Sequence, residues 1–378
     1  MTPTLPMAVV LAPGWVYLIG SAMAAVGFAR RPLPQPTICP EVTVLKPLCG
    51  AEPGLYENLR SFAEQEYPAL QLVLGVEGPD DGALPAARAL IRDLPGHDIV
   101  LAAGAGAGAN RKVANLENLL PRAHGRILVL ADSDMRVERH YLAAITAPLA
   151  DPTIGVVTCL YRGVPCGGKW SLFGALHINF EFLPSALVDA VLGMGGGCFG
   201  ATIALERATL AAIGGFAWLR DQLADDHRLG AAVRERGLAV HLSRYLVETR
   251  VFEPSFAGLW RHELRWARTV RGLAPLGYAG SVLAQPLALA ALGVVTARFG
   301  LISCAFLAIT LVLRWVSAGV VAKALALSAT GLWLLPARDA LSFAVFVASL
   351  FSRRVVWRDR RYRLDAGGQM RVDGDQSG

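Results

Sequence analysis

Charged residues are scarce in this chain of 378 residues. Asp, Glu, Lys and Arg together make up 17% of the sequence, whereas an average soluble protein has about a quarter. Hydrophobic residues make up 54%, and the mean hydropathy is +0.43. This composition argues against an ordinary soluble protein and predicts segments that lie in a membrane.

The sequence also lacks the motifs of several protein classes. None of its 6 cysteines forms a CxxC pair, and no zinc-type spacing, nucleic-acid-binding motif or internal repeat is present. We therefore expect no nucleic acid partner, and free thiols in a cytoplasmic domain. The net charge of +6 owes much to basic clusters beside apolar segments, whose natural partners are anionic lipid head groups. The cysteines are Cys39, Cys49, Cys159, Cys166, Cys198 and Cys304.

Two regions are nearly free of charge. Met7–Ala29 has no charged residue in 23 positions, enough for one membrane-spanning helix, and Arg30 and Arg31 follow it. We interpret it as an uncleaved anchor; a signal peptide fits less well, because the segment is long and lacks an early basic region. The second region begins with 22 uncharged residues, Leu276–Ala297, and continues in three shorter runs that suit spans or re-entrant segments. Those runs are Phe299–Leu313, Ala324–Ala337 and Ala340–Ser352.

The flanking basic residues predict the orientation of these segments. Arg30 and Arg31 follow the first segment, five arginines between 353 and 361 follow the last, and the positive-inside rule places both clusters on the cytoplasmic side. The C-terminal region should then cross the membrane an even number of times. We expect a multi-pass protein of the inner (cytoplasmic) membrane, with an anchor at residues 1–30, a cytoplasmic domain at 31–271, a membrane region at 272–354 and a basic tail at 355–378.

Within the cytoplasmic domain, short apolar runs alternate with helical patterns. The runs lie at 42–47, 70–77, 97–103, 126–131 and 154–159. Such alternation is typical of βαβ units and predicts an α/β domain with a mostly parallel sheet. Two further helices are expected at Leu219–Glu235 and Phe256–Val270. Between them and the sheet lies VLGMGGGCFGATIAL (191–205), whose glycines suit either close backbone approach in mobile loops or a turn before a strand.

Acidic residues follow two of the apolar runs, where α/β proteins bind their ligands. The motif DSD places Asp132 and Asp134 after the run 127–131, and two such carboxylates can hold Mg²⁺ or Mn²⁺ together with a substrate phosphate. The alternative is a strand-end cap with solvated acids. The motif VEGPDD places Glu77 and Asp81 where they could bind a ribose or base, although a simple turn explains it equally well.

Three more motifs carry basic or acidic groups suited to this chemistry. In GANRKVANLEN, Lys112 lies at a helix start suited to a diphosphate. In LADDHRLG, Asp226 could act as a general base. In RHELRW, Arg265 offers a fork for phosphate oxygens and Trp266 can stack. The alternatives are a solvated helix end, a charged helix face and interfacial anchoring, respectively.

Taken in order, these motifs resemble those of the lipid-modifying glycosyltransferases, D, D(x)D, D and (Q/R)xxRW. The chain is most similar to the ceramide glucosyltransferase family, and it looks closest to that family's bacterial hopanoid branch. The likeness is carried by VTVLKPLCGAEPGLYENLRSFAEQEYP, VVTCLYRGVP, FGATIALERATLAAIGGF, DQLADDHRLG and FSRRVVWRDRRYRL, and it covers nearly the whole chain. The last motif departs from the family, because His262 stands where Gln or Arg is usual.

The resemblance implies a fold, a reaction and a role for each motif. The fold would be glycosyltransferase-A in residues 31–271, and the reaction an inverting, metal-dependent hexosyl transfer from a UDP-sugar to a lipid hydroxyl. The favoured pair is UDP-N-acetylglucosamine with the hopanoid bacteriohopanetetrol, and the alternative is UDP-glucose with ceramide. The implied roles are nucleotide contact for Glu77 and Asp81, diphosphate contact for Lys112 and His262, metal binding for Asp132 and Asp134, general base for Asp226, and closure over donor and acceptor for Arg265 and Trp266.

Two other classes fit the sequence less well. A membrane transporter or scaffold would need charged residues along a path within the spans. Arg314, Arg338 and Asp339 are candidates, but the 77 residues from Leu276 to Ser352 hold only five charges. A glycoside hydrolase also uses paired carboxylates, yet it has no need of basic residues suited to a diphosphate.

Overall fold

The computed structural model describes residues 4–34, 36, 38–104, 106–193, 197–352, 354–357, 360–364 and 370–372. The chain forms two compact units. We call Pro32–Cys166 with Met194–Phe252 the sheet unit, and Met1–Arg31 with Gly167–Gly193 and Glu253–Gly378 the helical unit.

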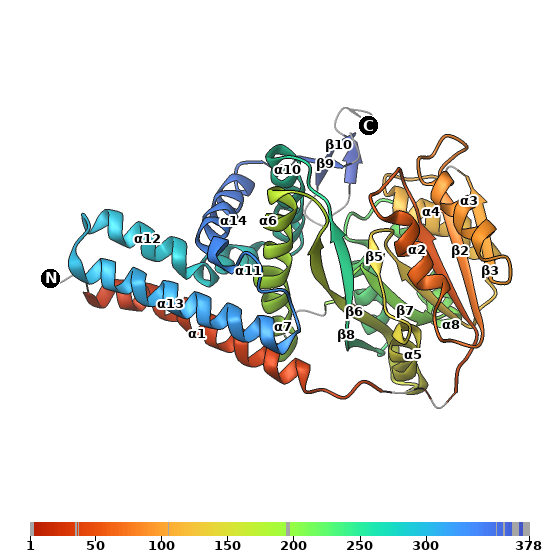
Figure 1. The fold of residues 1–378 in the computed structure, drawn as a ribbon, viewed down its shortest axis with the longest axis horizontal. Helices are drawn as coiled ribbons and strands as arrows, with labels where there is room; N and C mark the ends of the chain where they lie inside the picture. Colours follow the sequence, from red (N-terminus) through yellow and green to blue (C-terminus); the bar gives the residue numbers. More distant parts are fainter. Residues whose placement is uncertain are drawn as a thin grey trace. The chain divides into compact units, whose positions relative to one another are not determined.

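The sheet unit is built on an eight-stranded sheet in the order β3-β2-β1-β4-β7-β6-β8-β5 (Figure 1). Its strands are β1 (Val42–Pro47), β2 (Leu70–Val76), β3 (Asp98–Ala103), β4 (Ile127–Ala131), β5 (Met135–Arg136), β6 (Ile154–Pro165), β7 (Thr202–Glu206) and β8 (Ala239–Val251). The predicted parallel pairing is confirmed for β3, β2, β1 and β4. β6 and β8 are also parallel, whereas β7 runs antiparallel to both β4 and β6, and β5 to β8.

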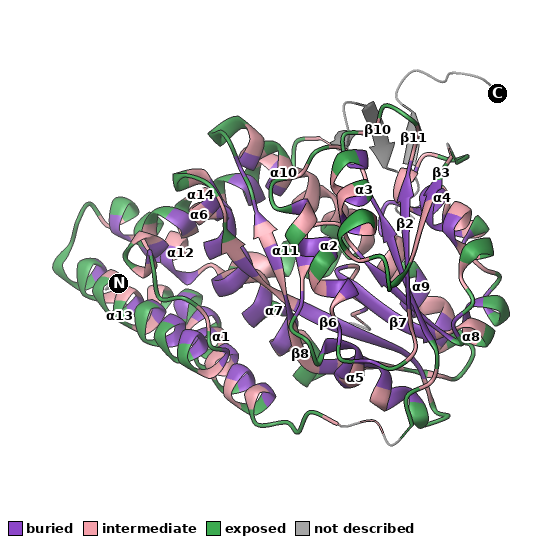
Figure 2. Cartoon of the chain, turned by 45° about the vertical axis from the view of Figure 1, so that its right-hand side comes forward, coloured by how far each residue is buried: buried purple, intermediate pink, exposed green. Residues whose placement is uncertain are grey.

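Helices cover both faces of this sheet. They are α2 (Leu55–Ala63), α3 (Leu84–Asp93), α4 (Arg111–Leu119), α5 (Tyr141–Thr146), α8 (Arg207–Ala212) and α9 (Asp225–Glu235), with 3₁₀ turns η1 (Leu120–Arg122), η2 (Ala147–Ala150) and η4 (Ala217–Leu219). Val44 of β1 packs in one core with α2, α3 and α5, while its neighbour Leu45 packs in a second core with α4 and α9. Figure 2 shows strands of this sheet, such as β6 and β7, coloured mostly as buried. Every residue of β1 and β4 is buried, and strands that are buried on both faces need apolar runs, which is why β1 and β4 were recognisable from the sequence.

The expected helix at Leu219–Glu235 is wrong in its first part, because α9 begins only at Asp225. The preceding residues are held in another conformation by the loop before α4. Asp221 Oδ1 accepts a hydrogen bond from Ala109 N at 2.9 Å, and Gln222 O accepts one from Asn110 Nδ2 at 2.7 Å. A strand follows the glycine-rich segment, as one of the two interpretations expected, although residues 194–196 lie outside the described residues.

The helical unit contains α1 (Thr4–Ala29), α6 (Lys169–His177), α7 (Leu183–Leu192), α10 (Phe256–Leu273), α11 (Pro275–Gly280), α12 (Pro286–Thr296), α13 (Leu301–Ala324) and α14 (Leu335–Ser349). Shorter helical turns are η3 (Ile178–Phe182), η5 (Ser281–Ala284) and η6 (Leu332–Leu334), and the tail forms a three-stranded sheet of β9 (Arg354–Trp357), β10 (Arg360–Leu364) and β11 (Met370–Val372). Two arginines of the predicted basic cluster, Arg353 and Arg358, lie outside the described residues.

Four helices of the described chain are long and apolar enough to cross a membrane: Pro6–Ala29, Lys169–Leu192, Leu301–Ala324 and Leu332–Ser349. The second was not expected from the sequence. The apolar run Leu276–Ala297 is not one straight helix but a pair, Pro275–Ala284 and Pro286–Thr296, bent by 65°. Pro286 explains the break, because proline has no N–H to continue the first helix.

Charges within the helical unit are paired across helices. Arg314 of α13 donates two hydrogen bonds of 2.8 Å to Asp339 of α14, and Arg338 donates two of 2.7 Å to Glu263 of α10. With the first pair in place, α13 continues through Arg314 to Ala324, whereas the predicted apolar run Phe299–Leu313 ended before this arginine. Because these charges neutralise one another, they act as contacts between helices. Arg314, Arg338 and Asp339, the candidates for a transport path, are therefore all engaged in ion pairs.

Candidate active site

The carboxyl ends of adjacent strands form the candidate site in the sheet unit. β2, β1 and β4 are neighbours in the parallel part of the sheet, so Glu77, Lys46 and Asp132 emerge at the same edge. The start of α4 faces this edge, because Asn115 Nδ2 donates to the carbonyl oxygens of Leu48 and Gly75 at 3.4 and 3.0 Å.

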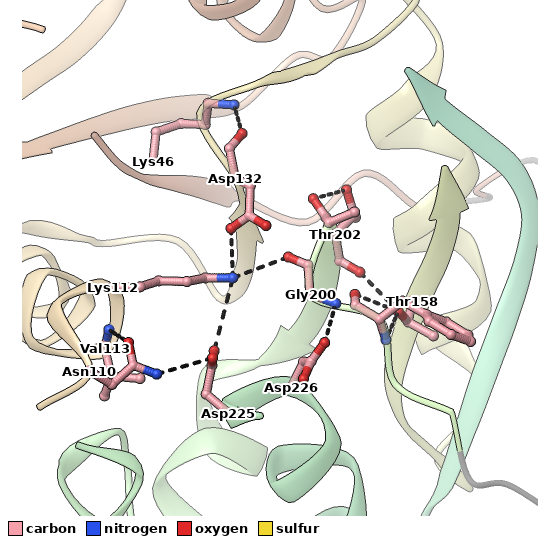
Figure 3. Close-up of polar contacts among 12 residues, drawn as sticks. Lys46, Asn110, Lys112, Val113, Asp132, Thr158, Gly200, Thr202, Asp225 and Asp226 are labelled. Carbon is pink, nitrogen blue, oxygen red and sulfur yellow. Dashed lines mark hydrogen bonds and ion pairs between the residues drawn. The ribbon is translucent and has the colours of Figure 1, made fainter. Parts of the chain in front are cut away.

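Lys112, in the first turn of α4, lies among carboxylates (Figure 3). Its Nζ is 2.6 Å from Asp132 Oδ1 and 3.9 Å from Asp225 Oδ2, and it donates to Gly200 O at 3.3 Å. Burial disfavours the charge on Lys112, but Asp132, Asp225 and Asp226 outweigh this effect and raise the pKa of Lys112. Residues from α4, β4 and α9 thus meet in one charged cluster, as the ordered motifs had suggested.

The two aspartates at the start of α9 have different partners. Asp225 Oδ1 accepts from Asn110 Nδ2 at 3.2 Å, and its other oxygen faces Lys112. Asp226 Oδ2 accepts from Gly200 N and Oδ1 from His227 N, both at 2.7 Å. Burial raises the pKa of both carboxyl groups, and the Lys112 ammonium opposes that rise. Asp225 is therefore engaged as a counter-ion. The hydrogen bonds to Asp226 within the described residues come from backbone N–H groups, and its carboxylate keeps lone pairs for a further proton.

The DSD loop presents its two carboxylates differently. The side chain of Asp132 is 35% exposed, and its Oδ2 accepts no hydrogen bond within the described residues. Asp134 turns inward, where its Oδ2 accepts from Thr249 Oγ1 at 2.7 Å. Burial, followed by the charges of Asp132 and Glu52, raises the pKa of Asp134 to about 6.

A cavity of about 380 Å³ opens beside the cluster. Its walls include Glu77, Asp81 and Arg111, and the last of these adjoins Lys112 at the start of α4. Glu77 and Arg111 form an ion pair. Asp81 fixes the loop around the cavity, because its Oδ1 accepts from Gly50 N at 2.8 Å and from Ala83 N at 3.0 Å.

The remaining predicted residues, His262, Arg265 and Trp266, lie on α10 of the helical unit. His262 Nδ1 is 2.7 Å from Glu253 Oε1, and its ring packs edge-on against Trp266 with centroids 4.5 Å apart. The glutamate between them in the sequence, Glu263, is committed to Arg338. His262, predicted to contact the diphosphate, therefore already has a carboxylate partner in Glu253.

A divalent cation fits the sheet unit only if it takes most of its ligands from substrate and water. No group of three or more His, Cys, Asp or Glu side chains with metal-binding geometry occurs among the described residues. Asp132 nevertheless offers an open carboxylate oxygen at the strand end. One or two carboxylates combined with substrate phosphates is the usual way in which Mg²⁺ is bound in phosphate-transfer sites.

Three residues of the cluster were not identified from the sequence. Lys46 lies at the end of β1, is fully buried, and donates from Nζ to Asp132 O at 2.5 Å. Burial lowers the pKa of Lys46 to about 7, against the raising influence of Asp134 and Asp132. Asn110 caps α4 by accepting from Val113 N at 3.2 Å. A side chain at Gly200 would place its Cβ 2.9 Å from Asp226 Oδ2. Of these three residues, Lys46 was the one that the sequence could have indicated, because a lysine is unusual in an apolar strand.

The fold and this cluster define a glycosyltransferase with the glycosyltransferase-A fold. A solved structure that covers 92% of this chain and 99% of its own, with a TM-score of 0.55 and 21% sequence identity, is the mannosyltransferase PcManGT from Pyrobaculum calidifontis in complex with GDP-Man and Mn2+. The model of Glycosyl transferase family 21 matches residues 6–370. The chain belongs to that family.

Curated relatives agree with this assignment. Ceramide glucosyltransferase 1 of Caenorhabditis elegans is 23% identical over 356 residues, which cover 90% of this chain and 74% of that protein. The ceramide glucosyltransferase of Komagataella phaffii is 32% identical over 113 residues, 29% of this chain and 22% of that protein. That of Gibberella zeae is 26% identical over 163 residues, 39% and 31%. The last two alignments span less than a third of those proteins.

Proposed function

We propose that this glycosyltransferase transfers glucose from UDP-glucose to a hydroxyl group of ceramide. The observation that carries the proposal is the meeting of Lys112, Asp132 and Asp226 at the strand ends of a family 21 glycosyltransferase. The acceptor follows from the relatives, which are named ceramide glucosyltransferases. A lipid acceptor also suits a chain whose helical unit exposes large apolar side chains such as Val16, Met23 and Leu301.

In this proposal the nucleotide occupies the cavity beside α4. Glu77 and Asp81 would lie near the nucleoside, and Lys112 would contact the diphosphate after releasing part of its interaction with Asp132. His262 would make a second diphosphate contact from α10. Free N–H groups at the start of a helix add to the attraction for phosphate.

The acceptor hydroxyl would lose its proton to Asp226. As the hydroxyl oxygen bonds to the anomeric carbon, the bond from that carbon to the UDP oxygen breaks and the configuration inverts. The raised pKa of Asp226 brings it closer to neutral pH, which favours proton transfer at this residue. Arg265 and Trp266 would close over donor and acceptor, the former opposing negative charge on the departing UDP.

The proposed metal is Mg²⁺ or Mn²⁺, held by Asp132 and Asp134 with diphosphate oxygens. When bound, it would supply positive charge that stabilises the leaving UDP. Asp132 suits this role through its open oxygen, whereas Asp134 would have to turn away from Thr249 to bind directly, or act through the loop.

We also propose that residues 31–271 form a catalytic domain on the cytoplasmic face of the inner membrane, with residues 272–354 as a multi-pass membrane region and 355–378 as a basic tail. Cys39 and Cys304 are both exposed and test the orientation. A membrane-impermeant thiol reagent applied to inverted vesicles should label Cys39, whereas labelling of Cys39 only in right-side-out vesicles would contradict it.

The decisive experiment incubates the purified protein with each of two donors and two acceptors. UDP-glucose with ceramide should give product in the presence of Mn²⁺. The second candidate pair, UDP-N-acetylglucosamine with bacteriohopanetetrol, is favoured by the likeness of the sequence motifs to the hopanoid branch, and product from that pair alone would replace ceramide as acceptor. Product from none of the four combinations, by a protein that remains folded, would contradict the proposal.

A further inference from the structure

The backbone of the DSD loop is held by donors from three different elements. Asp132 O accepts from Lys46 Nζ of β1 at 2.5 Å, and Ser133 O accepts from Asn58 Nδ2 of α2 at 3.3 Å. Asp134 O accepts from Arg250 N of β8 at 3.1 Å. Three successive carbonyl groups are therefore fixed, so the directions of the intervening side chains are fixed as well. Two of these donors, Lys46 and Asn58, belong to fully buried side chains.

A lysine at position 46 is unfavourable for stability, because its amino group is buried. It is 0% exposed, and within the described residues its Nζ has only the Asp132 carbonyl and the ring of Phe62, at 3.9 Å from the centroid, as direct partners. No carboxylate lies within ion-pair distance of it among those residues. Burying an amino group without a direct counter-ion destabilises the fold through desolvation, and an apolar side chain of similar volume is often neutral or stabilising in its place.

Asn58 is a second buried polar side chain that contacts the DSD loop. Its side chain is 0% exposed, its Nδ2 donates to Ser133 O, and its Oδ1 has no hydrogen-bond partner in the part of the chain that the structure describes. A buried polar atom left unpaired destabilises the fold. Both side chains thus reduce stability, and what they have in common is a hydrogen bond to a backbone carbonyl of the DSD loop.

We infer that Lys46, assisted by Asn58, is a positioning residue that orients the Asp132 carboxylate toward the diphosphate and its cation. Neither residue would touch the reacting atoms, because each acts through a backbone carbonyl of the loop. The inference rests on the proposed function, since it assumes that Asp132 serves a nucleotide and a divalent cation.

The test compares Lys46→Met with Thr43→Val, a matched control in the same strand. Thr43 is also 0% exposed, and its hydroxyl donates to Gln71 Oε1 at 2.7 Å and accepts from Gly125 N at 2.8 Å, at the opposite end of β1. Two quantities are measured for the full-length protein in detergent micelles: the dissociation constant of UDP in Mn²⁺ by titration calorimetry, and the midpoint of thermal unfolding.

Lys46→Met should weaken Mn²⁺-dependent UDP binding about 10–100-fold, the usual effect of losing a residue that orients a metal ligand, while its unfolding midpoint stays equal or rises. Thr43→Val should lower the midpoint and leave UDP binding unchanged. Unchanged UDP binding by Lys46→Met, or weaker binding accompanied by a drop in midpoint like that of the control, would overturn the inference.

A second variant covers the outcome in which Lys46→Met does not fold. Asn58→Leu removes only the donor to Ser133 O and an unpaired oxygen, so it should fold and weaken UDP binding in the same direction. Normal UDP binding by Asn58→Leu would then overturn the inference. Wild-type protein that binds no UDP with Mn²⁺ would instead overturn the proposed function, and this inference with it.

Discussion

Replacing Lys112 by methionine removes the positive charge at the centre of the site and should reveal how the carboxylates depend on it. The Nζ of Lys112 is 2.6 Å from Asp132 Oδ1. At that separation an effective dielectric constant of 20 gives an attraction of about 6 kcal/mol before desolvation is subtracted. Loss of one member of a buried pair costs about 3–5 kcal/mol, and the 35% exposure of the Asp132 side chain reduces this to roughly 2–3 kcal/mol.

The loss should depend on pH in a definite direction. Burial already raises the folded-state pKa values of Asp225 and Asp226, and the Lys112 ammonium opposes that rise. Without Lys112 these two pKa values rise further above those of the unfolded chain, so the folded protein binds more protons at intermediate pH. Stability of the variant then increases as pH falls through those folded-state values, and its deficit relative to wild type shrinks. The deficit should be largest at neutral and alkaline pH.

Thermal unfolding in detergent micelles measures this effect. At pH 7.5 the midpoint should fall by roughly 5–10 °C, since about 2–4 °C accompanies each kcal/mol in a unit of this size. The gap should narrow at pH 5. Lys323→Met makes the same chemical change at an exposed residue and should behave like wild type at both values. An equal midpoint for Lys112→Met and wild type at pH 7.5, or a gap that widens on acidification, would refute the reasoning.

Three further predictions follow from named contacts. Asp226→Asn should lower turnover about 10²–10⁴-fold, because the amide cannot take the acceptor proton, while calorimetry finds UDP-sugar binding intact; retained turnover would remove Asp226 from its role. The pair Asp132→Ala and Asp134→Ala should abolish metal-dependent donor binding, and wild-type donor affinity that is unchanged by EDTA would count against a metal. Arg338→Met should destabilise the protein by about 3–5 kcal/mol, because it leaves the 5% exposed Glu263 unpaired. Combining it with Glu263→Leu should restore most of the midpoint of thermal unfolding. A double variant that is no more stable than Arg338→Met alone would contradict this prediction.

Much of the site was accessible from the sequence because its residues stand at strand ends. Asp132 follows an apolar strand, and the carboxyl ends of parallel strands meet at one edge of a sheet. Lys112 was recognisable at a helix start for a similar reason. Glu77 and Asp81, which come from one motif, both line the cavity, and their contact with a nucleotide stays a prediction. What the motifs did not reveal was Lys46, whose position in an apolar strand gave no sign of which carbonyl it would meet 86 residues later.

The bounds of the membrane helices were also only partly predictable from the sequence. Hydropathy located α1 and the first part of α13, but the predicted run ended at Leu313, because a single sequence window does not show that Asp339 neutralises Arg314. Lys169–Leu192 was missed because it lies within a stretch that otherwise has many charges. Its middle is the π-helical turn η3, at the point where Pro184 can donate no hydrogen bond to the preceding turn.

The sequence by itself determined which segments are apolar on both faces, where acidic and basic motifs interrupt them, and to which family their order belongs. Only the tertiary structure decided that β7 enters the sheet antiparallel, that α9 starts at Asp225, and that Asp225 and Asp226 have different partners. The reason is physical. Periodicity and turn chemistry act over a few residues, whereas ion pairs and loop contacts depend on packing between segments about a hundred residues apart.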